Sequence, residues 1–170
     1  MAYSTVPKTR RDGVITLSAL VAGGGSPISL EVAYEDGNLS INTPQNYASQ
    51  VFRDRGDTVT VREGDDQQIT GSFAFHLRQF TDSVETGSIL DFIRKQGIYS
   101  TNESVGTVGT PYIQQYCIDI TYVADGTSVG DAAATQVLLS KCVIDSYDFT
   151  EGDPDSVSLS FTCYGGAVLS

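Results

Sequence analysis

The sequence predicts a mainly β protein in which two packed antiparallel sheets form a β-sandwich or flattened barrel with one flanking α-helix. Several segments alternate apolar and polar side chains with a period of two, which is typical of strands that bury one face. Clusters of Gly, Asp, Asn and Pro separate these segments and favour turns. The 170 residues are enough for one domain with a substantial core.

The first part of the chain predicts an extended arm followed by antiparallel strands. Residues 1–12 are polar, so we expect an N-terminal arm and then a single domain over residues 13–170. Strands are expected over residues 14–21 and 28–34, where apolar side chains alternate with smaller or polar ones. The Asp36-Gly37 dipeptide that follows is a strong hairpin signal and predicts a return strand.

A long irregular loop is expected over residues 39–56, because residues 43–56 show no usable period. Loops longer than about 12 residues are uncommon in compact domains unless they are functional or disordered. This one carries Tyr47, Val51 and Phe52. These apolar side chains could contact a partner protein or pack back on their own domain, and the sequence leaves both interpretations open.

The middle of the chain predicts a hairpin and then a helix. Residues 58–62 and 69–80 are expected to pair across a turn-forming segment. A helix is expected over residues 83–96, because Asp82-x-x-Glu85 resembles a capping box and apolar residues follow at helical spacing. Gly97 supplies a C-terminal stop.

The end of the chain predicts the clearest strand pair. Residues 112–123 read as one strand, and residues 142–149 and 157–163 form a long hairpin around the turn formers at 151–155. Asp145 falls on the otherwise apolar face of the first hairpin strand. The other face carries hydroxyls and a carboxylate but no cation: Ser146, Asp148, Ser158, Ser160 and Thr162.

Charge and cysteine content exclude several classes of function. The formal net charge of −11 disfavours binding to nucleic acid or to an anionic membrane, because phosphate binding is driven by Lys and Arg. The three cysteines are too widely spaced for a disulfide framework or a zinc site, so we expect reduced, buried thiols. No segment has the roughly 20 apolar residues that span a bilayer, and the N-terminus has no apolar run typical of a signal peptide.

The short motifs that resemble catalytic or metal-binding sites lack the partner residues or the spacing that such sites require. Gly126-Thr-Ser-Val-Gly130 matches the elbow of α/β-hydrolases, but the required histidine must lie downstream and His76 lies upstream. Asp153 and Asp155 lack the spacing of a calcium loop. We therefore expect no enzyme activity, no cofactor and no metal.

Five features of the chain, taken in order, carry a resemblance to a known protein family. They are the basic arm ending in Arg10-Arg11-Asp12-Gly13, the strand pair around Asp36-Gly37 with its long loop, Arg62-Glu-Gly-Asp-Asp66 before ITGSFAFHLR, the single mid-chain helix, and the hairpin CVIDSYDFTEGDPDSVSLSFTCYG. In this arrangement the chain resembles the major tail tube proteins of long-tailed, siphovirus-like bacteriophages. The resemblance covers essentially the whole chain, and no single motif is diagnostic.

The resemblance implies a structural subunit whose hexameric rings stack into the tail tube, a negatively charged conduit for DNA. It implies self-association, contacts with the tape measure, terminator and baseplate or tip proteins, passage of DNA without specific binding, and no membrane partner. The protein would be made and assembled in the host bacterial cytoplasm and would reside in the tail of the virion.

The resemblance also assigns candidate contact residues. Residues of the long loop would touch the next ring: Tyr47, Val51, Phe52, Arg53 and Arg55. Residues of the N-terminal arm would reach a neighbouring subunit: Lys8, Arg10 and Arg11. The polar face of the final hairpin would line the lumen, as the candidates Ser146, Asp148, Ser158, Ser160 and Thr162.

Two other functions remain open from the sequence. The chain is also compatible with an inner-tube or terminator protein of a related contractile tail or injection system. A carbohydrate-binding β-sandwich would need exposed aromatics on one strand face, for which the row of Tyr112, Tyr116 and Tyr122 is a candidate. Those tyrosines alternate with Ile118 and Ile120 in a way that is more typical of a core.

Overall fold

The computed structural model describes ten stretches of the chain: residues 13–21, 25–32, 39–44, 47–55, 57–76, 79–81, 86–103, 115–124, 134–152 and 155–169. Several sequence expectations lie outside these residues. They are the N-terminal arm over residues 1–12, the Asp36-Gly37 turn, the Asp82-x-x-Glu85 capping box and the Gly126–Gly130 motif.

Nine strands form one antiparallel sheet in the order β2-β1-β10-β11-β12-β6-β3, with β9 on β1 and β13 on β11. Their bounds are β1 Gly13–Val21, β2 Gly25–Val32, β3 Ser40–Asn42, β6 Ile69–His76, β9 Asn102–Glu103, β10 Ile118–Ala124, β11 Thr135–Thr150, β12 Ser156–Cys163 and β13 Ala167–Leu169. Two further antiparallel pairs join β4 Tyr47–Asp54 to β5 Asp57–Asp66 and β7 Gln79–Thr81 to β8 Thr86–Ser88.

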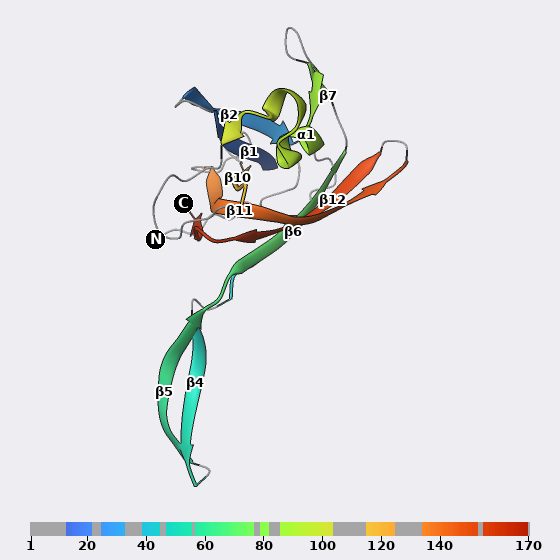
Figure 1. The fold of residues 1–170 in the computed structure, drawn as a ribbon. Coiled ribbons are helices and arrows are strands. Elements are labelled where there is room, and N and C mark those ends of the chain that lie inside the picture. The colour runs from blue at the N-terminus through green and yellow to red at the C-terminus, as the bar shows by residue number, and fades with distance from the viewer. Residues whose placement is uncertain are drawn as a thin grey trace.

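The sheet folds into two layers, and the long strand β11 belongs to both of them. Its first half pairs with β10 up to Cys142, and its second half pairs with β12 from Cys142 onward. Figure 1 shows β1 and β2 on one side of the layer that contains β11, β12 and β6. Buried side chains from both layers form a single cluster, which includes Leu17, Phe73 and Leu159. The predicted fold class, mainly β and antiparallel with one helix, is confirmed, and its two layers are continuous through β11.

The helix is shorter than the sequence predicts. α1 spans Ile89–Arg94, after which Lys95 adopts the left-handed conformation with φ 55°. Ser88 caps it: the Ser88 hydroxyl accepts a hydrogen bond from the Asp91 N–H at 3.2 Å, and Asp91 Oδ2 accepts one from the Ser88 N–H at 3.0 Å. The expected helix near residues 83–96 is therefore wrong at both ends, because β8 occupies Thr86–Ser88 and the helix already ends at Arg94. Figure 1 places α1 beside β1 and β2.

The expected loop over residues 39–56 is largely strand. It contains β3 and β4, and β4 pairs with β5 through Val51 opposite Val61. The β4–β5 hairpin extends away from the nine-stranded sheet (Figure 1). A strand whose faces are not buried against a core lacks the alternation by which strands are recognised, which is why this pairing escaped the sequence reading.

The expected pairing of residues 58–62 with residues 69–80 is also wrong. β5 pairs with β4, whereas β6 pairs with β12 and with β3. The predicted turn formers at residues 63–66 are part of β5, and residues 67–68 connect β5 to β6, which belongs to a different sheet. This connection places β6 at the centre of the layer that carries the candidate site.

Candidate functional site

Four neighbouring strands align a face of hydroxyl groups. Ser146 of β11 lies opposite Ser160 of β12, Ser160 lies opposite Ser72 of β6, and Ser72 lies opposite Ser40 of β3. The Ser146 and Ser160 hydroxyl oxygens are 2.8 Å apart. Rows on either side add the remaining members of this polar face: Asp148, Ser158 and Ala74, then Thr162, Thr70 and Asn42. The five residues predicted to share one face of the final hairpin do so.

A β-bulge at Asp145 keeps this face polar along β11. Ile144 lies opposite the buried Phe161, but Tyr147 lies opposite the buried Leu159, so one extra residue enters between Ile144 and Ser146. Asp145 is exposed, and its Oδ2 accepts a hydrogen bond from the Thr162 hydroxyl at 2.7 Å. The expectation that Asp145 faces inward is therefore wrong, because the bulge shifts the alternation and turns its carboxylate toward the polar face.

The polar face is shallow and carries negative charge. Ser72, Ala74, Ser146, Asp148, Ser158 and Ser160 surround a hollow of about 240 Å³, backed by Phe73 and Leu159. Asp145 and Asp148 contribute carboxylates, and the described strands β3, β6 and β12 contribute no Lys or Arg. Sequence reasoning alone did not select Ser40, Asn42, Thr70 and Ser72 as part of this site. The alternation of β6 contained a signal for Thr70 and Ser72, but their position beside the final hairpin required the cross-strand register.

Among the described strands, none pairs with the outer edge of the four-stranded polar layer on either side, and these two edges are called open. β3 ends the described strand order, and the last described pair between β10 and β11 is Ile118 opposite Cys142. No described strand pairs with the β10 side of residues 143–150. Tyr147 and Phe149 at this edge are 37% and 50% exposed. The Arg94 guanidinium of α1 lies 5.9 Å from the centre of the Tyr147 ring.

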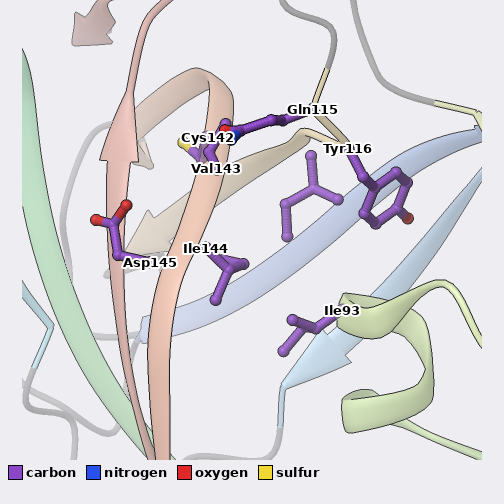
Figure 2. Close-up of a pocket in the computed structure, with 8 residues that line it drawn as sticks. Ile93, Gln115, Tyr116, Cys142, Val143, Ile144 and Asp145 are labelled. Atoms are coloured by element: carbon purple, nitrogen blue, oxygen red, sulfur yellow. The ribbon is translucent and has the colours of Figure 1, made fainter.

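A second hollow lies between α1 and the open edge of β11. It measures about 390 Å³ and is lined by Ile93, Gln115, Tyr116, Ile118 and residues 142–145. Figure 2 shows Ile93 and Ile144 facing this space from α1 and β11. The lining is mixed: most of it is apolar, and Gln115 and Asp145 are its polar residues.

The β4–β5 hairpin exposes an apolar pair. Val51 and Phe52 are each 48% exposed, and the Arg62 guanidinium lies 5.7 Å from the centre of the Phe52 ring. Arg53 and Arg55 are exposed near the end of the hairpin, where Arg55 has φ 52°. The Tyr47 backbone pairs with Asp66 at the other end. Lys8, Arg10 and Arg11, the predicted arm contacts, lie outside the described residues.

The Asp119 carboxyl is partly buried and contacts the backbone of β11. Burial raises the pKa of Asp119, and the Lys141 N–H, which donates to Asp119 Oδ1 at 2.9 Å, opposes that rise. Lys141 has φ 54° and lies where the β10–β11 register shifts, so Asp119 supports the backbone at the bend of β11. In the described part of the chain, no three His, Cys, Asp or Glu side chains gather as a metal site would require. None of its helices has the length and apolar character needed to cross a membrane.

Comparison with solved structures identifies the fold. No protein-family model matches the chain, and no curated protein matches it by sequence. A chain of the PVC sheath–tube complex, from an extracellular contractile injection system in the extended state, is 12% identical with a TM-score of 0.55, over 99% of both chains. The SPP1 tail tube is 12% identical with a TM-score of 0.56, over 96% of this chain and 79% of that one.

A third structure extends the likeness to the end of a tube. A chain of the anti-feeding prophage tube-terminating cap is 9% identical with a TM-score of 0.55, over 100% of this chain and 95% of that one. These identities are low, so the likeness concerns the fold. The chain has the fold of tail tube and tube terminator proteins from phage-like tails, which confirms the resemblance drawn from the sequence.

Proposed function

We propose that this protein is a structural subunit of a phage-like tail tube. Six copies close into a ring, the rings stack, and the bore conducts DNA. The observation that carries the proposal is the polar layer formed by β3, β6, β12 and the second half of β11, which is lined with hydroxyls and is open at both edges.

The two open edges supply the means of ring closure. An open strand edge presents unpaired N–H and C=O groups that pair with another strand. In a ring, β3 of one copy pairs with residues 143–150 of the next, so each copy uses both edges once. Such head-to-tail contacts close when the rotation between copies divides a full turn. The polar faces then join into one continuous inner wall.

The chemistry of the polar face suits the passage of DNA. Asp145 and Asp148 repel phosphates, and serine and threonine hydroxyls offer hydrogen bonds without the positive charge that holds nucleic acid in place. The formal net charge of −11 acts in the same direction over the whole subunit. DNA therefore travels through the bore without a binding site.

The β4–β5 hairpin serves the contact between rings. Val51 and Phe52 are too exposed to contribute fully to the folding of their own domain, and burial against the next ring removes them from water. Arg53 and Arg55 add polar contacts around that pair. The N-terminal arm, with Lys8, Arg10 and Arg11, reaches a neighbouring subunit.

This function places the protein in the tail of a virion assembled in the host cytoplasm, beside tape measure, terminator and baseplate or tip proteins. The role is structural, without catalysis and without a membrane partner. The likeness to the tube-terminating cap favours one second candidate, a terminator that ends the tube. The carbohydrate-binding alternative is weaker, because the two described tyrosines of the candidate row, Tyr116 and Tyr122, pack against the core. Tyr112 lies outside the described residues.

Negative-stain electron microscopy of the purified protein over a range of concentrations tests the proposal. We expect rings with a central pore at low concentration and stacked tubes at high concentration. Single rings that never stack at any concentration favour the terminator. Monomers at every concentration, also in the presence of preformed tube fragments as an initiator, contradict the proposal.

A further inference from the structure

We propose that Cys142 and Cys163 form a cross-strand disulfide under oxidising conditions, which covalently joins β11 to β12 at the bend of the sheet. The proposal concerns the folded subunit alone and does not depend on the proposed role in a tube. It adds a modification site that the spacing of the cysteines in the sequence did not predict.

The register sets the two residues directly opposite each other. The Tyr164 N–H donates to the Lys141 carbonyl at 3.2 Å, which makes the next pair, Cys142 and Cys163, a non-hydrogen-bonded pair. In such pairs the Cα atoms are about 4.5 Å apart and the side chains are at their closest. That spacing lies within the range of about 4.4–6.8 Å at which disulfides form.

The sulfur atoms themselves are in near-bonding positions. Cys142 Sγ lies 2.7 Å from Cys163 Sγ. Non-bonded carbon atoms pack at about 3.5–4.0 Å, and sulfur is larger than carbon. Figure 2 shows the Cys142 sulfur directed away from Ile93 and Tyr116. No large backbone movement is needed to bring the two sulfurs together.

The surrounding backbone holds this geometry. Ser140 makes two backbone hydrogen bonds beside the pair: its carbonyl accepts from the Gly165 N–H at 3.0 Å, and its N–H donates to the Gly166 carbonyl at 3.1 Å. The Lys141 N–H donates to Asp119. Both cysteines are therefore fixed where β10, β11 and β12 meet, and a bond between them clamps the point where the two layers join.

Burial of the two thiols determines the stage of folding at which the disulfide forms. Cys142 and Cys163 are 0% and 2% exposed. The hydrogen bond with Cys163 and burial both raise the pKa of Cys142, which keeps it a thiol in the folded protein. Since the thiolate is the attacking species, exchange in the folded state is slow. The bond forms while the chain folds, before the pair is buried.

The reaction balances with a small disulfide such as oxidised glutathione. One cysteine thiolate attacks the glutathione disulfide and releases a first glutathione as its thiolate. The other cysteine thiolate then attacks the protein sulfur of the mixed disulfide and releases the second glutathione. Two cysteine thiols lose two protons and two electrons in total, and one glutathione disulfide becomes two glutathione thiols.

The test is refolding of the full chain from denaturant in a buffer of reduced and oxidised glutathione, followed by acid quenching and peptide mapping by mass spectrometry. With Cys117, which is also buried, the chain has three cysteines, and these allow three alternative pairings. We expect Cys142–Cys163 to dominate and a titration of the denatured product to find one free thiol instead of three. The oxidised form should melt on the order of 5–10 °C above the reduced form.

Matched variants separate the pair from the third cysteine. The mass of Cys117→Ser should still fall by two hydrogens on oxidative refolding, because the Cys142–Cys163 disulfide can form. The mass of monomeric Cys163→Ser should not change. Three free thiols in the refolded wild type would overturn the proposal, as would a dominant pairing through Cys117. Should Cys163→Ser fail to refold, Cys163→Ala offers the same readout without a new hydroxyl in the core.

Discussion

At the scale of single residues, two side chains determine how β11 turns from one layer to the other. Asp119 accepts a hydrogen bond from the Lys141 N–H at 2.9 Å, where the β10–β11 register shifts. Asp145 forms the second irregularity and accepts a hydrogen bond from Thr162 at 2.7 Å. Each carboxylate thus satisfies a group at a place where the regular pairing of the strand is interrupted, and each is tied to the path of the backbone.

Replacing Asp119 with Asn should change the pH dependence of stability. The pKa of Asp119 is raised in the folded protein because of burial, so the folded state binds more protons than the unfolded state between the unfolded and the folded pKa. Its contribution to the free energy of unfolding therefore falls as the pH rises through that window. Asn cannot titrate and still accepts a hydrogen bond from Lys141.

Urea denaturation of both forms between pH 3.5 and pH 7 measures this effect. The stability of Asp119→Asn relative to wild type should increase with pH across the titration of the carboxyl. Asp155→Asn is the control, because Asp155 lies in the exposed turn where it accepts a hydrogen bond from the Gly152 N–H. A difference between Asp119→Asn and wild type that stays constant over this range would contradict the assignment of the raised pKa.

Gly71 is a second position where one residue decides packing. It lies opposite Phe161 in the β6–β12 pair, and an added Cβ would collide with the Phe161 ring and approach the Ser40 carbonyl oxygen to 2.8 Å. Gly71→Ala should therefore lower the free energy of unfolding by about 1–3 kcal/mol. The neighbouring Ser72→Ala, on the exposed side of the same strand, should change it by about 0.5 kcal/mol or less. Equal stability of the two variants in chemical denaturation would show that the ring moves away freely.

At the scale of elements, the sequence predicted those strands that bury one face. β12 alternates the buried Val157, Leu159 and Phe161 with hydroxyl residues, so its faces could be assigned from the pattern. The pattern could not reveal the Asp145 bulge, since one extra residue in β11 is recognised only by its partner strand. Nor could it reveal which strand β5 would pair with, because the β4–β5 hairpin exposes Val51 and Phe52 and leaves no periodic signal. Register and long-range pairing depend on two segments together, so they cannot be predicted from the pattern of one segment.

The β4–β5 hairpin leads to a prediction that separates folding from assembly. Val51→Ser with Phe52→Ser removes exposed apolar area from the hairpin, so the melting temperature should change by no more than a few degrees. Stacking of rings should be lost, because that area is what the next ring would bury. Gln50→Ser, at an exposed position on the same strand, is the control and should still form tubes.

Sedimentation velocity together with electron microscopy measures the outcome for the hairpin variants. Discrete rings from the double variant, with tubes from wild type and from Gln50→Ser, agree with a stacking role. Tubes of normal length from the double variant would place the contact between rings elsewhere. A large fall in melting temperature would instead show that the pair belongs to the fold of its own domain.

At the scale of the whole molecule, one continuous sheet provides both the buried core and a polar layer whose edge strands have no partner among the described strands. β11 runs through both layers, so the buried cluster that includes Leu17 and Leu159 stabilises the same strand whose second half is left open. A free strand edge favours uncontrolled association unless a specific partner covers it. The proposed ring gives each open edge a defined partner in a neighbouring copy and leaves the hydroxyl face toward the bore.

Phe149→Lys tests this arrangement at the open edge of β11. Phe149 is 50% exposed, so a lysine there should leave the monomer folded, with a melting temperature within a few degrees of wild type. A charged side chain on a strand edge opposes pairing with another strand, and we expect rings and tubes to be lost together. This outcome differs from that of the hairpin variant, which should retain rings. Val168→Lys, at an apolar residue of β13 that is 59% exposed, is the control and should assemble as wild type. Normal rings from Phe149→Lys would show that subunits join through another surface, even if the tube itself is confirmed by microscopy.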